Sequence, residues 1–121
     1  FSGFYLACMF VKNEIVQILL DDPRVDIMLS DKYNWSPLMS VACNGRTETV
    51  KRILSASGWR RIDVMQKSTK DDGEIKAGST AIDMAKQYDR NEIVAMLEEY
   101  SRNQQETAKK YSKELNIKGN I

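Results

Sequence analysis

A few clustered carboxylates are the residues of this sequence that come closest to a chemical site. Asp21, Asp22 and Asp26 lie close together, and residues 70–73 read Lys-Asp-Asp-Gly, as in a fragment of a calcium loop. Carboxylate oxygens are the ligands that Ca²⁺ and Mg²⁺ prefer, but a calcium loop also needs alternating Asp or Asn ligands and a closing glutamate. Both clusters lack that pattern. We expect no metal site, and interpret the first cluster as a solvated helix end and its turn.

Other catalytic chemistry is poorly represented. The sequence contains no histidine, the commonest general base and a frequent zinc ligand. It also lacks a phosphate-binding loop, a nucleophile elbow and cysteine pairs at metal spacing. Cys8 and Cys43 are far apart in apolar stretches, which favours two buried thiols over a disulfide and an intracellular, cytoplasmic location. We therefore predict no catalytic residue, cofactor or small-molecule substrate, and no enzyme activity.

Charge and hydrophobicity exclude two further classes of partner. Lys and Arg total 18 and Asp and Glu total 17, so the net charge is only +1. Nucleic-acid and acidic-membrane binding would favour a strongly basic chain. No run approaches 18 apolar residues, the length of a membrane-spanning helix. The hydrophobic fraction of 42% suits a thin solenoid better than a thick, sheet-centred core.

An internal repeat organises the chain. At an offset of 34 residues, Ser2 meets Ser36 and Glu14 meets Glu48; after a further 44 residues, Glu48 meets Glu92. The first and third copies share an identical tetrapeptide, Asn-Glu-Ile-Val, at residues 13–16 and 91–94. Three copies of one unit are therefore present, with ten extra residues between the second and third.

Each copy has the pattern of two short antiparallel helices. In the second copy, Ser36 is a favourable N-cap, Pro37 suits the first helical position, and residues 44–45, Asn-Gly, end the first helix. Apolar residues then recur at helical spacing: Leu38, Val41, Ala42, Val50, Ile53 and Leu54 in this copy; Phe4, Ala7, Cys8, Ile15, Val16, Ile18, Leu19 and Leu20 in the first; Ile82, Ala85, Ile93, Val94, Met96 and Leu97 in the third. Helices this short need burial against neighbouring copies. Between copies, Asn34 suits a projecting turn because it tolerates positive φ.

At this point the unit resembles the ankyrin repeat, whose signature is T-P-L-H-x-A over about 33 residues. Residues 36–39 read Ser-Pro-Leu-Met, and Ala42, Gly45 and Leu54 follow at the family's positions. Val11 and Asp89 stand where the family has its turn glycine. The resemblance implies an all-α solenoid of helix-turn-helix units with projecting turns, over residues 1–100. We place the three repeats at about 1–30, 31–64 and 75–100, with an insertion near 65–74 and a C-terminal helix and tail at 101–121.

The resemblance also implies a protein partner that binds the projecting turns and the exposed side of the first helices. On that basis the candidate partner-binding residues are Met9, Phe10, Lys32, Tyr33, Trp35, Cys43, Asn44, Lys76, Gln87 and Tyr88. Tyr and Trp dominate interface hot spots, although Trp35 could instead pack against its own turn. Met9 and Phe10 could face either a partner or a repeat upstream.

Two further segments carry alternatives. Trp59, Arg60 and Arg61 open the insertion and could anchor this loop or contact a ligand. Residues 104–115 predict a helix with Ala108, Tyr111 and Leu115 on one apolar stripe. A cap over the open end of the stack is its favoured interpretation, and a basic partner-binding tail is the alternative.

The main functional hypothesis is a protein-interaction module. Because the sequence starts within a structural pattern and without Met, we expect it to be the C-terminal part of a longer ankyrin-repeat protein. The alternatives are a regulatory or capping segment of a larger enzyme with no ligand of its own, and nucleic-acid binding, which the balanced charge disfavours. The identity of the partner does not follow from the fold.

Overall fold

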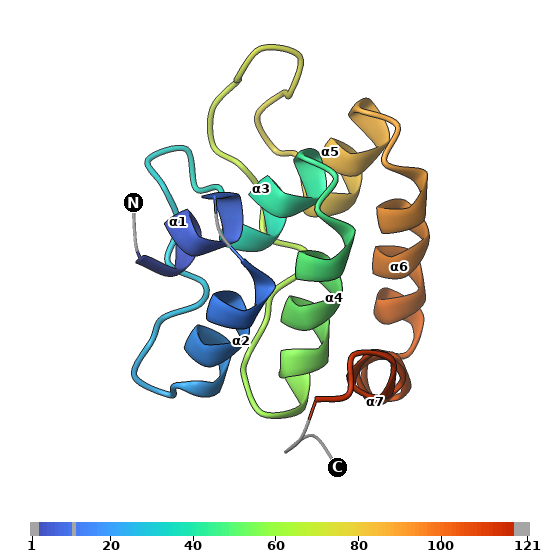
Figure 1. Ribbon diagram of the computed structural model, residues 1–121. Helices are drawn as coiled ribbons and strands as arrows, with labels where there is room; N and C mark the ends of the chain where they lie inside the picture. Colours follow the sequence, from blue (N-terminus) through green and yellow to red (C-terminus); the bar gives the residue numbers. More distant parts are fainter. Residues whose placement is uncertain (1–2, 11, 118–121) are drawn as a thin grey trace.

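The computed structural model describes residues 3–10 and 12–117, which form seven α-helices and one short 3-10 helix, with no β-strand (Figure 1). The elements are α1 (Gly3–Phe10), α2 (Asn13–Asp21), α3 (Pro37–Cys43), α4 (Thr47–Ser55), η1 (Ala56–Gly58), α5 (Ala81–Gln87), α6 (Asn91–Arg102) and α7 (Gln104–Glu114). The predicted all-helical class is confirmed. In the described part of the chain, every helix is too short or too polar to cross a membrane.

Three helix pairs stack side by side. The inner row is α1, α3 and α5, the outer row is α2, α4 and α6, and each helix packs on its pair partner and on its row neighbour (Figure 1). First helices start at Gly3, Pro37 and Ala81, and second helices at Asn13, Thr47 and Asn91, which reproduces the offsets of 34 and 44 residues. We refer to α1–α2, α3–α4–η1 and α5–α6 as units one, two and three.

The predicted helix start in unit two is confirmed. The Ser36 hydroxyl accepts a hydrogen bond from the Met39 amide at 3.2 Å, with Pro37 at the first helical position. In unit three, Thr80 accepts from the Asp83 amide at 3.3 Å, and the Asp83 carboxylate accepts from the Thr80 amide at 3.0 Å. These caps satisfy backbone donors that a helix cannot satisfy internally. Ser2, the corresponding residue of unit one, lies outside the described residues.

The turns between paired helices need a left-handed backbone. Gly45 has φ of +74°, and Asp89, at the equivalent position of unit three, has φ of +56°. Asp is among the few non-glycine residues that tolerate this region, so the departure from glycine leaves the turn of unit three intact. Val11 lies outside the described residues. Asn34 also has a positive φ, +61°, as predicted.

The core lies between the two rows of helices. Equivalent positions are buried from unit to unit, as Val16 and Val50 show, both fully inaccessible, and Leu20 with Leu54 likewise. Two residues predicted for the core of unit one differ: Ile15 is 42% exposed and Ile18 66% exposed. They lie on the side of α2 away from α4, where no described helix covers them.

The ten extra residues are divided between two places. Asp26 and Asp63 make the same turn, in which the carboxylate accepts from the amide two residues later, Met28 or Met65. These aspartates are 37 residues apart, so three extra residues precede Asp63, where η1 prolongs the second helix. The other seven enlarge the loop that leads to α5. The exact bounds of the repeats stay a prediction.

The C-terminal helix was expected to cover the open end of the stack, but its position is different. α7 packs on α4, η1 and α6, and it lies near their lower ends in Figure 1. Its buried residues are Thr107, Ala108, Tyr111 and Ser112, so the predicted stripe is present. The end of unit three remains polar, with Lys86 and Glu98 exposed, and needs no apolar cover.

Candidate protein-binding surface

Two projecting loops and the inner helices frame a cavity. The first finger, residues 31–35, is closed by the Asp31 amide donating to the Trp35 carbonyl at 3.0 Å. The second finger, residues 68–79, is closed by the Ser68 amide donating to the Ser79 carbonyl at 2.9 Å. A cavity of about 650 Å³, here the finger cavity, lies between the first finger, α1 and α3. Its lining residues are Tyr5, Met9, Ser30, Asp31, Lys32, Tyr33, Trp35, Ser40, Asn44 and Asp72.

Asp31 organises the wall of this cavity. One carboxylate oxygen accepts from the amides of Tyr33 at 2.8 Å and Trp35 at 2.9 Å, and the other accepts from the Tyr5 hydroxyl at 3.3 Å. The Tyr5 hydroxyl is also hydrogen-bonded to the Ser40 hydroxyl. Burial raises the pKa of Tyr5 above its ordinary value, so this hydroxyl stays neutral at physiological pH. The network fixes the first finger to α1 and α3.

The two fingers support one another. The Asn34 side chain donates to the Lys67 carbonyl at 2.9 Å, and the Thr69 amide donates to the Tyr33 carbonyl at 2.9 Å. Gln66 donates to the Asn34 carbonyl at 2.8 Å. A partner that contacts the first finger therefore meets a surface that is already ordered, and pays less conformational entropy on binding.

Tyr33 is flanked by two cations. The Nζ atoms of Lys32 and Lys70 lie 5.5 Å and 5.8 Å from the centre of its ring, within the range of cation–π attraction. Lys32 is exposed and Tyr33 half-buried. Both predicted residues thus lie at the mouth of the finger cavity.

Trp35 differs from the expectation of a projecting aromatic. Only 9% of it is exposed, and it belongs to the hydrophobic core while its edge lines the finger cavity. Burying a large aromatic ring at the base of the finger stabilises the fold more than leaving it exposed to solvent. Its indole N–H has no hydrogen-bond acceptor among the described residues.

Of the other predicted residues in units one and two, some line the finger cavity and others do not. Met9 and Asn44 line the finger cavity, and the Asn44 side chain donates to the Ser40 carbonyl at 2.7 Å. Phe10 is 76% exposed but is not part of the cavity lining. Cys43 is half-buried; burial raises the pKa of its thiol, and burial raises that of Cys8 to about 12. Neither cysteine is a reactive thiolate near neutral pH.

Lys76, Gln87 and Tyr88 are exposed but lie outside the finger cavity. The Gln87 side chain donates to the Glu74 carboxylate at 3.0 Å, which links α5 to the second finger. Sequence reasoning missed Tyr5, Asp31 and Ser40, because only the folded chain brings their side chains together.

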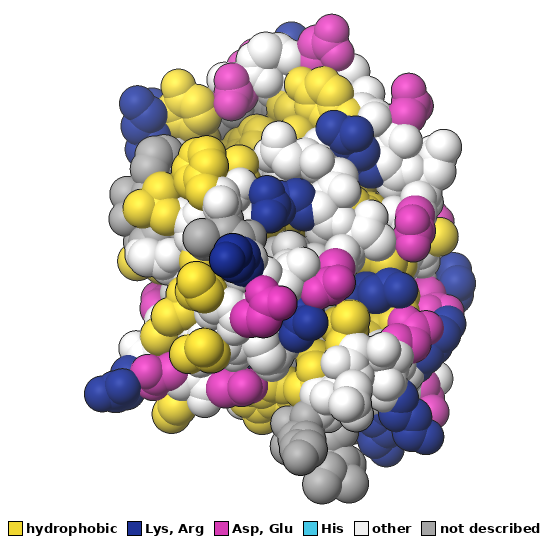
Figure 2. Space-filling view, viewed as in Figure 1, with side chains coloured by type: hydrophobic (Ala, Val, Ile, Leu, Met, Phe, Trp, Pro, Cys, Tyr) yellow, Lys and Arg dark blue, Asp and Glu magenta, His cyan; other side chains and the backbone are white. Residues whose placement is uncertain are grey.

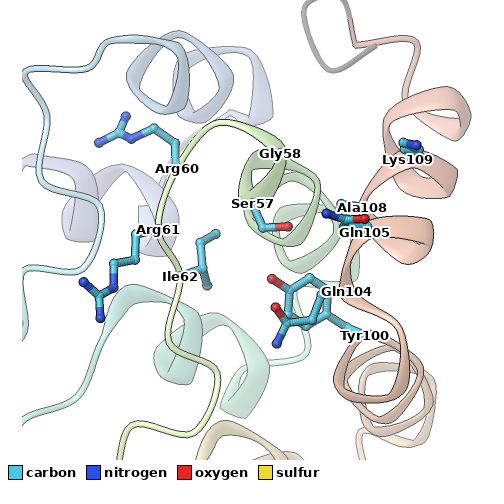
Figure 3. A pocket seen from close by; sticks show the side chains of 10 residues that line it. All are labelled: Ser57, Gly58, Arg60, Arg61, Ile62, Tyr100, Gln104, Gln105, Ala108 and Lys109. Carbon is cyan, nitrogen blue, oxygen red and sulfur yellow. The ribbon is translucent and has the colours of Figure 1, made fainter.

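The Trp59–Arg61 segment anchors its loop. The Arg60 guanidinium donates to the carbonyls of Leu20 and Asp22 at 2.9 Å each and to that of Val25, and the Trp59 indole donates to the Leu20 carbonyl at 3.3 Å. These bonds satisfy carbonyls at the end of α2. Arg60 and Arg61 belong to the lining of a groove of about 480 Å³ beside α7, and Figure 3 shows their side chains extending away from Gln105 and Ala108 of this helix.

The carboxylate cluster of residues 21–26 is engaged in local contacts. Arg24 bonds both oxygens of Asp22, at 3.0 Å and 2.9 Å, and this contact lowers the pKa of Asp22 to about 2. Asp26 accepts from the Met28 amide. Within residues 3–10 and 12–117, no group of histidine, cysteine or carboxylate side chains has the arrangement of a metal site.

Stacked helix pairs, projecting fingers and a preorganised cavity define a helical repeat protein of the kind that presents a binding surface. The chain belongs to the ankyrin repeat family: the model of this family, described as ankyrin repeats (3 copies), matches residues 4–109. Ankyrin repeats are generally protein–protein interaction modules and typically non-catalytic. No curated protein and no solved structure matches the chain significantly.

Proposed function

We propose that this chain is a protein-interaction module, the C-terminal part of a longer ankyrin array, and that its partner binds the fingers and the concave face of the inner helices. The finger cavity is the observation that supports this most directly. It offers apolar lining at Met9 and Tyr33 beside hydrogen-bonding groups of Ser30, Asn44 and Asp72. Such a combination accepts an apolar side chain of a partner and fixes its main chain at the rim.

The partner in this proposal is another protein, with no nucleic acid, membrane or small-molecule substrate involved. The mixed charge near the cavity, Lys32 and Lys70 beside Asp31 and Asp72, supports this choice. It offers neither the single-sign field that phosphate backbones need nor the constellation of a catalytic site. An intracellular, cytoplasmic, non-enzymatic role completes the proposal, in keeping with two free, buried or half-buried thiols.

The test is affinity capture from a lysate of the source cell, followed by titration calorimetry with the protein retained. Met9→Ala and Tyr33→Ala each remove part of the cavity lining and should weaken binding about 10-fold or more, as expected for interface hot spots. Met65→Ala is the matched control, because Met65 is 57% exposed and lies outside the cavity. Circular dichroism verifies that every variant is folded.

Equal affinity of wild type and both cavity variants would exclude the finger cavity. If the wild-type chain captures nothing, the alternative gains support: a terminal capping or regulatory segment of a larger enzyme, with no ligand of its own.

A further inference from the structure

Unit one exposes an apolar surface on the side away from unit two. Five large hydrophobic residues of α1, α2 and the following loop form what we term the N-terminal face: Leu6 (43% exposed), Phe10 (76%), Ile15 (42%), Ile18 (66%) and Leu29 (51%). Figure 2 shows hydrophobic side chains gathered along the edge of the molecule over α1 and α2. Contiguous exposed apolar surface of this kind marks an interaction site.

The repeat register shows what covers this surface in the other units. Leu6 corresponds to Ser40 and Met84, and Ile15 to Thr49 and Ile93, at offsets of 34 and 44 residues. All four counterparts are buried, with exposed fractions of 2% or less. Ser40 and Thr49 are covered by unit one itself: Ser40 bonds the Tyr5 hydroxyl, and the Thr49 hydroxyl donates to Asn13 at 2.8 Å. The part of the N-terminal face formed by Leu6 and Ile15 is therefore the surface on which a unit receives the preceding one, whereas the counterparts of Phe10, Asn44 and Tyr88, stay exposed in their units.

A hydrogen bond recurs at both existing interfaces. The Arg46 guanidinium of unit two donates to the Met9 carbonyl at 2.8 Å, and that of Arg90 in unit three donates to the Cys43 carbonyl at 3.1 Å. Met9 and Cys43 are equivalent residues near the ends of α1 and α3.

Lys12 takes the same position in unit one, since it precedes Arg46 by 34 residues and Arg46 precedes Arg90 by 44. Lys12 is exposed at the start of α2. It is a cationic donor at the position where, in the register of units two and three, a preceding unit would offer the carbonyl near the end of its first helix.

Among the described residues, unit three differs at the opposite end of the array. Leu20 and Leu54, which are fully buried, correspond to Glu98 in unit three, which is exposed. At this position unit three is therefore polar, whereas unit one exposes apolar residues on its far side.

We propose that the N-terminal face is the docking site of a further ankyrin unit of the same polypeptide, stacked in the register of the existing units, with Lys12 donating to the main-chain carbonyl at the end of its first helix. This inference rests on the longer array of the proposed function and specifies the missing contact. Leu6, Ile15 and Ile18 match the apolar Met84, Ile93 and Met96 of unit three. The occupant therefore presents an apolar surface like the one with which α3 and α4 of unit two pack on α5 and α6 of unit three. A unit of the same polypeptide is favoured over a separate protein, because a connecting loop as short as the fingers would hold it next to the N-terminal face at high effective concentration.

The test adds such a unit to the whole chain. Residues 37–80 are fused directly before Gly3, which reproduces the natural junction between Thr80 and Ala81, and thermal unfolding is followed by circular dichroism. We expect the melting temperature of the fusion to exceed that of the 121-residue chain by several degrees. Ile18→Glu and Lys12→Ala should lower the melting temperature of the fusion and leave that of the 121-residue chain unchanged. Ala95→Glu, exposed on α6, is the control that should affect neither.

No gain in melting temperature, or equal effects of Ile18→Glu in both proteins, would overturn the proposal. So would a dimer of the 121-residue chain in sedimentation that Ile18→Glu dissociates, since a second copy would then be the occupant. Failure of these stacking tests with partner capture intact leaves the binding role standing. Loss of capture with stacking intact refutes the finger cavity alone.

Discussion

Gly45 connects two functions in one residue: it makes the turn of unit two and leaves room for a contact from unit three. Its φ of +74° disfavours any side chain, and a Cβ atom would lie 3.1 Å from the Arg90 guanidinium. That guanidinium bonds the Cys43 carbonyl across the interface between the units. The turn and the stacking of units therefore depend on the same absent side chain.

Gly45→Ala should lower the free energy of unfolding by about 1–3 kcal/mol, because the left-handed backbone is strained and Arg90 must shift. Urea denaturation measures this loss. Gly73→Ala is the matched control: Gly73 has φ of +59° with no atom within 4 Å of the added Cβ. A smaller loss for Gly73→Ala would isolate the contribution of the Arg90 contact, and equal losses would attribute the whole effect to backbone strain.

At the scale of the element, α5 is a seven-residue helix that depends on its cap and its neighbours. Isolated helices shorter than roughly 12–15 residues are marginal in water. Thr80 and Asp83 bond one another's backbone amides, and Ala81, Met84 and Ala85 are buried against the stack. The cap and the packing together hold the last inner helix in place.

Thr80→Ala should therefore cost about 1 kcal/mol of stability, the usual value for the loss of an N-cap hydroxyl. Thr80→Ser keeps the accepting oxygen and should retain most of that free energy in the same urea titration. If Thr80→Ser lost as much as Thr80→Ala, the methyl group of the buried Thr80, and not the cap, would be the stabilising part.

At the scale of the whole molecule, α7 fastens the outer helices of units two and three together. Lys110 and Glu99 form an ion pair at 3.1 Å, Lys51 and Glu114 one at 3.2 Å, and the Tyr111 hydroxyl donates to Glu99 at 3.2 Å. The hydrogen bond from Lys110 is the main cause that lowers the pKa of Glu99 below its ordinary value. Glu99 thus stabilises the docked α7 in its charged form.

Acidification should weaken the docking of α7. A carboxylate whose pKa is lowered by folding stabilises the folded state above its ordinary pKa, about 4.3, and this contribution is lost as the pH falls through the folded pKa. Glu99→Gln should increase hydrogen exchange in α7 at pH 7, and this difference from wild type should disappear once the pH falls below the lowered pKa of Glu99. Glu98→Gln, an exposed neighbour, should have no effect at either pH. A Glu99 effect that persists at low pH would contradict the charge-based explanation.

Patterns within and between the repeats were sufficient to predict the helices, since each depends on local spacing. Ser36 and Pro37 marked a helix start, and Val50, Ile53 and Leu54 a buried face, all as observed. The finger cavity was only partly predictable. Lys32 and Tyr33 came from the family's geometry, whereas Tyr5 and Ser40 required knowledge of which side chains meet 35 residues apart.

The sequence alone determined the repeat, its helix pairs and their caps, because offsets of 34 and 44 residues and local capping rules are properties of the linear chain. Only the tertiary structure decided the positions of three features, because these positions depend on burial and on long-range contacts. Trp35 lies in the core and not on the surface, α7 crosses the outer helices and not the open end, and the apolar Ile18 of unit one is exposed. Each depends on which surfaces meet after stacking. The spacing of apolar residues along the sequence is the same whether such a surface is buried or exposed.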